Sequence, residues 1–123
     1  MKNIFYLHWD EQELKARIKP LKELGLKIHS HWSTKETAKW GDSLPDIFVV
    51  SIDRLPSHGR QYVEWLWEAK KRQHIPVIFV GGQPDKIAQT KSKFPKAIYC
   101  TNEQLVEKLN NMLKKVELKK QII

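Results

Sequence analysis

The sequence predicts an α/β fold in which a five-stranded parallel sheet, with strand order 2-1-3-4-5, lies between two layers of helices. Short apolar runs alternate with amphipathic segments along the whole chain. The two most apolar runs, IFVV at 47–50 and VIFV at 77–80, are typical of strands buried on both faces. Right-handed crossover connections would place such strands side by side in one sheet.

The first predicted strand covers Asn3–His8, and a helix follows it. Asp10 is a suitable N-cap for this helix, with Glu13 three residues later as in a capping box. Three apolar side chains are spaced for one helical face: Leu14, Ile18 and Leu21. Gly25 is a good residue to end the helix, and Pro20 inside it should kink or split it.

The alternating run Leu26–His31 predicts a second strand, less buried than the first. Ser33 and Glu36 have the spacing of a capping box, so we expect a short helix around Lys35–Trp40. Asp46–Ile52 is then the central buried strand.

A polar loop, Asp53–Arg60, leads from the central strand into an amphipathic helix that we expect to reach about Gln73. The buried face of this helix should contain Tyr62, Val63, Leu66 and Ala69. Val77–Val80 is the fourth strand, and Pro84 fits the first position of a helix over about 85–91.

The last predicted elements are a short strand, Ala97–Cys100, and a helix opened by a capping box of Thr101 and Gln104. The buried face of that helix should contain Leu105, Leu109, Met112 and Val116. We expect a single domain over residues 1–118 and a frayed C-terminal end over 119–123.

The composition, with 41% hydrophobic and 29% charged residues, is typical of a globular protein. The net charge of +8 invites a nucleic-acid hypothesis, but the basic residues are spread over helix faces, as in Lys15, Arg17, Lys19 and Lys22. We interpret these faces as solvated and do not expect a nucleic-acid partner. No apolar run or signal peptide indicates a membrane, and the single Cys100 favours a cytoplasmic location.

The stretches PDIFVVSIDRLPSHG and IPVIFVGG resemble the third strand with its loop, and the fourth strand, of the receiver domain of bacterial two-component response regulators. This resemblance extends over nearly the whole chain and implies a receiver-like, or flavodoxin-like, fold. The run RLPSHGR with HIPVIFVGG is also similar to a small family of uncharacterised bacterial proteins, which implies no function.

In a receiver, an aspartate ends strand 3 and is phosphorylated, an acidic pair after strand 1 binds magnesium, and a Ser/Thr and a Lys follow strands 4 and 5. Here Ser51 is nearest to the strand 3 position, with Asp53 two residues later, and His8–Asp10 supplies one carboxylate. Gly81–Gly82 and Thr101 stand where the hydroxyl and the lysine are expected. Because phosphoryl transfer needs both cation and acceptor, these departures predict a degenerate pseudo-receiver that is not phosphorylated.

The carboxyl ends of the strands should form the crevice where a ligand would bind. The candidate ligand- or anion-binding residues there are Asp10, Ser51, Asp53, Arg54, Ser57, His58, Arg60, Gly81 and Gly82. Ser57 is placed to cap the next helix, whose N-terminus attracts anions, and Arg54 and Arg60 could add donors. The alternative is a turn built by Pro56 and Gly59, with Arg54 paired to Asp53 or Asp10.

We assign no catalytic residues, metal or cofactor. His8, Asp10 and His31 are weak candidates for metal ligands, because alternate strand residues share a face. The neighbours Ser57 and His58 do not form a recognisable catalytic arrangement, and neither a dinucleotide-binding nor a P-loop motif is present.

We therefore expect a non-catalytic signalling or regulatory domain that acts through contacts with a protein partner. An anion- or nucleotide-binding protein, or an enzyme, that uses the Asp53–Arg60 loop stays open as the alternative. A homodimer also stays open, because Trp65 and Trp67 cannot both face the core and one of them could join an association patch. Trp9 and Trp32 follow the first two strands and could flank the crevice.

Overall fold

The computed structural model describes residues 3–36, 38–40 and 43–122, with side chains as far as residue 114. The strands in this part of the chain are β1 (Asn3–Leu7), β2 (Lys27–His31), β3 (Ile47–Ser51), β4 (Val77–Val80) and β5 (Ile98–Cys100). The helices are α1 (Glu11–Glu23), α2 (Pro56–Leu66), α3 (Pro84–Lys93) and α4 (Leu105–Ile122). Neighbouring strands are all parallel in the order β2-β1-β3-β4-β5, which confirms the predicted fold class.

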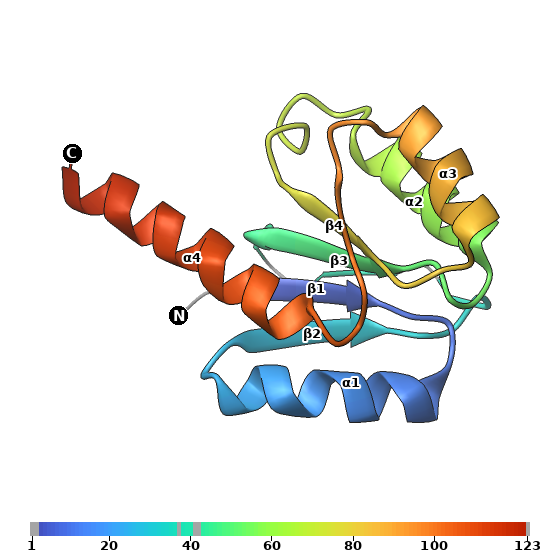
Figure 1. Cartoon of the computed structure of the whole chain (residues 1–123), viewed down its shortest axis with the longest axis horizontal. Helices are drawn as coiled ribbons and strands as arrows, with labels where there is room; N and C mark the ends of the chain where they lie inside the picture. The colour runs from blue at the N-terminus through green and yellow to red at the C-terminus, as the bar shows by residue number, and fades with distance from the viewer. Residues whose placement is uncertain (1–2, 37, 41–42, 123) are drawn as a thin grey trace.

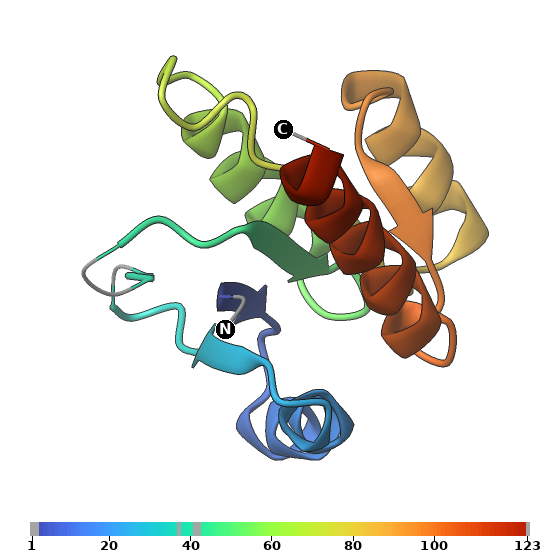
Figure 2. The same cartoon turned by 90° about the vertical axis from the view of Figure 1, so that its left-hand side faces the viewer.

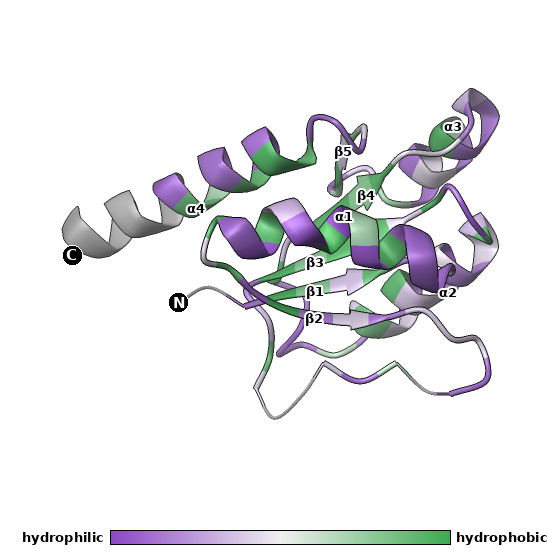
Figure 3. Cartoon of the chain, turned by 90° about the horizontal axis from the view of Figure 1, so that it is seen from below, coloured by the Kyte–Doolittle hydropathy of each residue, from purple (hydrophilic) through white to green (hydrophobic). Residues whose placement is uncertain are grey.

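Helices cover both faces of the sheet, α1 and α4 on one side and α2 and α3 on the other (Figure 1). Because successive side chains of a strand point to opposite faces, each strand contributes to two separate cores. Tyr6 and Val49 pack in the core beneath α1 and α4, and Phe5 and Phe48 pack in the core beneath α2 and α3. Figure 3 shows the resulting pattern, with apolar strands and polar outer sides of the helices.

Three of the local signals expected at helix ends are confirmed, those at Asp10, Gly25 and Thr101. The Asp10 carboxylate accepts the Glu13 N–H at 2.9 Å and caps α1, and Gly25 follows the end of that helix with a φ of 83°. Thr101 and Gln104 exchange hydrogen bonds of 3.2 and 3.0 Å between side chain and backbone, as a capping box requires. Pro20 does not split α1, which continues to Glu23.

The helix expected around Lys35–Trp40 is not formed in the described residues of that segment, so this prediction was wrong. The Ser33 hydroxyl accepts the Lys35 N–H at 3.1 Å in a local turn instead of opening a helix. Trp40 packs edge-on against Phe48, with ring centroids 5.8 Å apart, and its side chain is half-buried there. Tertiary packing of an aromatic side chain therefore covers the sheet where a helix was expected.

Helix α2 ends at Leu66, seven residues before the predicted end at Gln73. The guanidinium of Arg72 folds back and donates to the carbonyl oxygens of Leu66 at 2.9 Å and Trp65 at 3.2 Å. The Trp67 indole N–H donates to the Ile75 carbonyl at 3.2 Å. The two bonds from Arg72 satisfy carbonyls of the last turn of α2, and the chain continues from there in a series of turns.

Helix α4 packs on the sheet through its first half, where Leu105, Leu109 and Leu113 are buried, and Val116 lies outside the described side chains. Its second half projects past the sheet, toward the viewer in Figure 2. None of the helices in the described residues is long and apolar enough to cross a membrane.

Candidate functional site

The candidate site is the rim of the sheet where β1, β3 and β4 end. Asp53, two residues after β3, occupies its centre. One carboxylate oxygen, Oδ1, accepts the Gly82 N–H at 2.7 Å, and the other, Oδ2, accepts from Nη2 of Arg17 at 2.7 Å. Burial favours the neutral carboxyl, but these two donors outweigh it and hold the pKa of Asp53 below its ordinary value.

Glu13, in the first turn of α1, is the second acidic residue of the rim. Its carboxylate accepts from the guanidinium of Arg54 and from Nε2 of His8, the latter at 2.8 Å. These hydrogen bonds lower the pKa of Glu13 to about 2, and the bond from Arg54 has the larger effect. Glu13 is therefore an anion held between two donors at neutral pH.

His8 follows β1, is completely buried, and lies between Glu13 and Arg17. A neutral imidazole fits the geometry: Nε2–H donates to Glu13, and Nδ1 is left to accept a long contact of 3.5 Å from Nη1 of Arg17. The same Nη1 donates to the buried Ser51 hydroxyl at 3.4 Å. Burial lowers the pKa of His8, and the Arg17 charge acts in the same direction, against the hydrogen bond to Glu13.

We call this chain of contacts the rim network; in order, its members are Arg54, Glu13, His8, Arg17, Asp53 and Gly82. Donors and acceptors alternate along it, and two arginines balance two carboxylates while His8 is neutral. It ties α1 to the ends of β1, β3 and β4. The rim network is a closed set of internal ion pairs rather than an open cluster of like charges.

The two glycines after β4 have a role in this arrangement. Gly81 and Gly82 have φ values of 76° and 93°, in the left-handed region that favours glycine. A Cβ on Gly81 would overlap the Asp53 carboxylate, and one on Gly82 would lie 2.8 Å from the Ile52 side chain. Asp53 folds onto this backbone, which leaves no room there for a serine or threonine side chain.

The state of His8 predicts how stability depends on pH. A histidine whose folded pKa lies below its unfolded value of about 6.5 binds its proton more readily in the unfolded chain. The free energy of unfolding should therefore be constant above that pH and fall as the pH drops toward 5. A second loss should follow below about pH 4.5, because Glu13 and Asp53 both have lowered pKa values. Urea unfolding at a series of pH values measures both.

The control for this prediction is His8→Gln, whose amide can still donate to Glu13. Its stability should be flat between pH 7 and 5 and should keep the loss below about pH 4.5. A wild-type protein that becomes more stable on acidification from pH 7 to 5 would contradict the buried neutral state of His8.

Other residues of the Asp53–Arg60 loop behave differently from expectation. Ser57 is not the helix cap, because α2 begins at Pro56 and its N-cap is Leu55, with a φ of 46° and no capping side chain. Arg54 pairs with Glu13 and not with Asp53 or Asp10.

The remaining candidates of that loop lie on the α2 side of the rim. The exposed His58 ring lies edge-on to Trp9, with centroids 5.8 Å apart, and Arg60 is half-buried. Trp9 also contacts His31 edge-on, while Trp32 is 46% exposed. Asp53, Arg54, Ser51, Gly81 and Gly82 are thus in or beside the rim network, and Ser57, His58 and Arg60 are outside it.

The residues present do not fit a magnesium ion. Asp10 caps α1, and the carboxylates of Glu13 and Asp53 are bound by arginines. Across the described residues, no three His, Cys, Asp or Glu side chains converge where a metal ion could be held. Of the weak metal candidates, His8 binds Glu13 and His31 contacts the Ser33 carbonyl at 2.6 Å.

Sequence reasoning missed Glu13 and Arg17 as members of the site. Glu13 was interpreted as a capping partner, and Arg17 as part of a solvated basic face, yet the Arg17 side chain is only 15% exposed. A signal existed: the two residues are four apart and each directly precedes a buried residue, Leu14 or Ile18. They therefore border the apolar stripe of α1 and face the sheet edge.

No protein-family model matches the chain, and no curated protein is detectably similar in sequence. Among solved structures, chemotaxis protein CheY4 of Vibrio cholerae is similar with a TM-score of 0.72 and 14% identity, over 90% of this chain and 98% of that one. The phosphorylated cyanobacterial phytochrome response regulator RcpA has a TM-score of 0.63 and 14% identity, over 94% and 91%. A de novo designed Rossmann 2x3 protein reaches 0.61 and 14%, over 94% and 91%. At such identities the likeness establishes the fold and does not assign a function.

Proposed function

We propose that this protein is a receiver-like regulatory domain that acts through contacts with another protein and is not switched by phosphorylation of Asp53. The main observation in support of this proposal is that both oxygens of the Asp53 carboxylate accept hydrogen bonds, one from Arg17 and one from Gly82. An aspartate that accepts a phosphoryl group must turn one oxygen toward the phosphorus and needs a divalent cation beside it. Here Arg17 and the Gly82 N–H fix the orientation of the carboxylate, and a guanidinium stands beside it in place of a divalent cation.

The position of Arg17 supports this proposal. Its guanidinium lies among Asp53, Ser51 and His8, and so supplies positive charge at the place where a cation would otherwise balance the carboxylate. A guanidinium is always charged and cannot dissociate from the protein. The charge of the Asp53 carboxylate is therefore balanced at neutral pH by Arg17, without an added metal ion.

Exposed aromatic residues support the protein-contact part of the proposal. Trp65 on α2 is 44% exposed, and the guanidinium of Arg72 lies 4.4 Å from its ring. Trp32 is exposed to a similar extent. Tryptophan and arginine are the residue types most enriched where proteins bind one another.

The alternative anion site is supported less well. Of the two arginines that the Asp53–Arg60 loop offers to an anion, Arg54 is already paired with Glu13, so the half-buried Arg60 is left as the one without an ion pair to any described residue.

A phosphodonor assay tests the proposal. The protein is incubated with acetyl phosphate and magnesium chloride and examined by intact-mass spectrometry, beside a response regulator known to accept phosphate from that donor. We expect no stable phosphoryl adduct on this protein. An adduct that disappears in Asp53→Asn would overturn the proposal, and one that persists in that variant would place the modification elsewhere and leave Asp53 unmodified as expected.

A further inference from the structure

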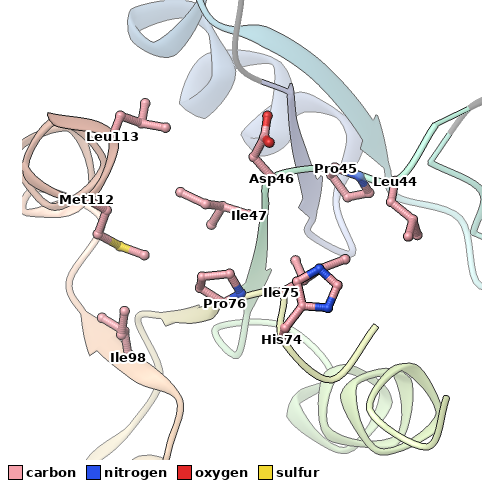
Figure 4. A pocket seen from close by; sticks show the side chains of 10 residues that line it. All are labelled: Leu44, Pro45, Asp46, Ile47, His74, Ile75, Pro76, Ile98, Met112 and Leu113. Carbon is pink, nitrogen blue, oxygen red and sulfur yellow. The ribbon is translucent and has the colours of Figure 1, made fainter. Parts of the chain in front are cut away.

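A second feature lies at the opposite end of the sheet from the rim network, where the strands begin. A hollow of about 620 Å³ opens there beneath the middle of α4 (Figure 4). Met112 and Leu113 of α4 line one side, Ile98 of β5 and Ile47 of β3 line its floor, and the segment 74–76 lines the other side. Its volume is in the range of sites that take several apolar side chains.

This hollow continues toward α2. A neighbouring hollow of about 430 Å³ shares His74, Ile75 and Pro76 with the first and extends to Trp67 and Lys96. The two hollows therefore adjoin at these three residues, and together they lie along the starting edge of the sheet. We call the two together the sheet-base groove. It runs from α4, past the start of β4, to the turn that follows α2.

Lysines outnumber acids among the residues that line the sheet-base groove, that lie in the turn between two lining residues, or that directly follow one in the chain. Lys96 lines the groove, and the turn between Trp67 and His74 carries the exposed Lys70 and Lys71 beside one exposed acid, Glu68. Lys114 directly follows the lining residue Leu113 and is exposed. The lining also contains one acid, Asp46, whose carboxylate accepts the Asn3 N–H at 2.8 Å. An apolar floor bordered by lysines is complementary to an apolar segment bordered by carboxylates.

The groove is also accessible to a long partner. The second half of α4 leaves the sheet and projects outward, so it does not fold back over the hollow (Figure 1). Apolar grooves open at their ends are the usual receptors for amphipathic helices, which place large side chains one turn apart into them.

We propose that the sheet-base groove docks an amphipathic helix of a partner protein, with apolar side chains on one face and Asp or Glu residues beside that face. The lysine border argues against a second copy of this chain as the occupant, because the projecting half of α4 contains four lysines and one glutamate. The inference names a contact surface for the proposed regulatory role, and it does not depend on whether Asp53 is phosphorylated.

Fluorescence anisotropy with two labelled peptides of about 18 residues tests this inference. Both carry the same leucines at helical spacing, one with glutamates and the other with lysines beside them. At low salt we expect the acidic peptide to bind at least about tenfold more tightly, with the difference shrinking as salt is added. Met112→Glu should weaken binding of the acidic peptide about tenfold, and Lys96→Glu a few-fold.

The matched control is Lys19→Glu, which makes the same change in net charge at an exposed position of α1 outside the groove. It should leave peptide binding unchanged. Equal binding of the two peptides, binding of neither, or a dimer in sedimentation that Met112→Glu dissociates would each overturn the inference. Phosphorylation of Asp53 would overturn the proposed function but would not affect this result.

Discussion

Replacing Arg17 with methionine is expected to lower the free energy of unfolding by about 2 kcal/mol. The methionine keeps the apolar stem of the side chain but leaves the Asp53 carboxylate and the Ser51 hydroxyl without their guanidinium partner. Removing one member of a fully buried ion pair typically lowers the free energy of unfolding by more than this. Asp53 is 32% exposed, so water can solvate part of the charge that is left unpaired. Urea unfolding followed by tryptophan fluorescence measures the change.

Lys15→Met is the matched control on the same helix. Lys15 forms an exposed pair with Glu11 at 3.3 Å, so its replacement should change stability by less than about 0.5 kcal/mol. In the double variant Arg17→Met/Asp53→Asn the loss should be smaller than the sum of the two single losses, because the unpaired charge is gone. Equal effects of Arg17→Met and Lys15→Met would refute the structural importance of the rim network.

Gly81→Ala is expected to lower the free energy of unfolding by about 3 kcal/mol, from backbone strain and from a lost charged hydrogen bond. The φ of 76° disfavours any side chain, and the new methyl group would overlap the Asp53 carboxylate. Asp53 would have to move away from the Gly82 N–H, and the rim network would lose one end. Thermal and urea unfolding measure the loss.

Gly25→Ala separates these two causes. Gly25 has a similar φ of 83°, but a Cβ there would meet nothing within 4 Å. It should therefore show only the conformational penalty, about 1 kcal/mol. If both alanine variants lose the same free energy of unfolding, the overlap of the new methyl group with Asp53 in Gly81→Ala has no effect. Our account of Gly81 would then be wrong.

The strand pattern, the sheet order and the starts of α1 and α3 could be predicted from the sequence. Val77–Val80 was located to the residue, because a fully buried strand needs an unbroken apolar run. The caps at Asp10 and Thr101 are equally local, since each involves residues three apart. The parallel arrangement then followed from right-handed connections, and the order 2-1-3-4-5 is the common one for five such strands.

The tertiary structure decided the rest, because it depends on which side chains meet across the fold. Trp40 packs against Phe48 instead of joining a helix, and Arg72 ends α2 from six residues beyond it. The pairing of Arg17 with Asp53 joins positions 36 apart in the chain, and no local pattern encodes it. Sequence alone placed Asp53 at the rim with few of the ligands a phosphorylation site needs. Only the packing of α1 against the strand ends provides its arginine partner and leaves the carboxylate with both oxygens bound.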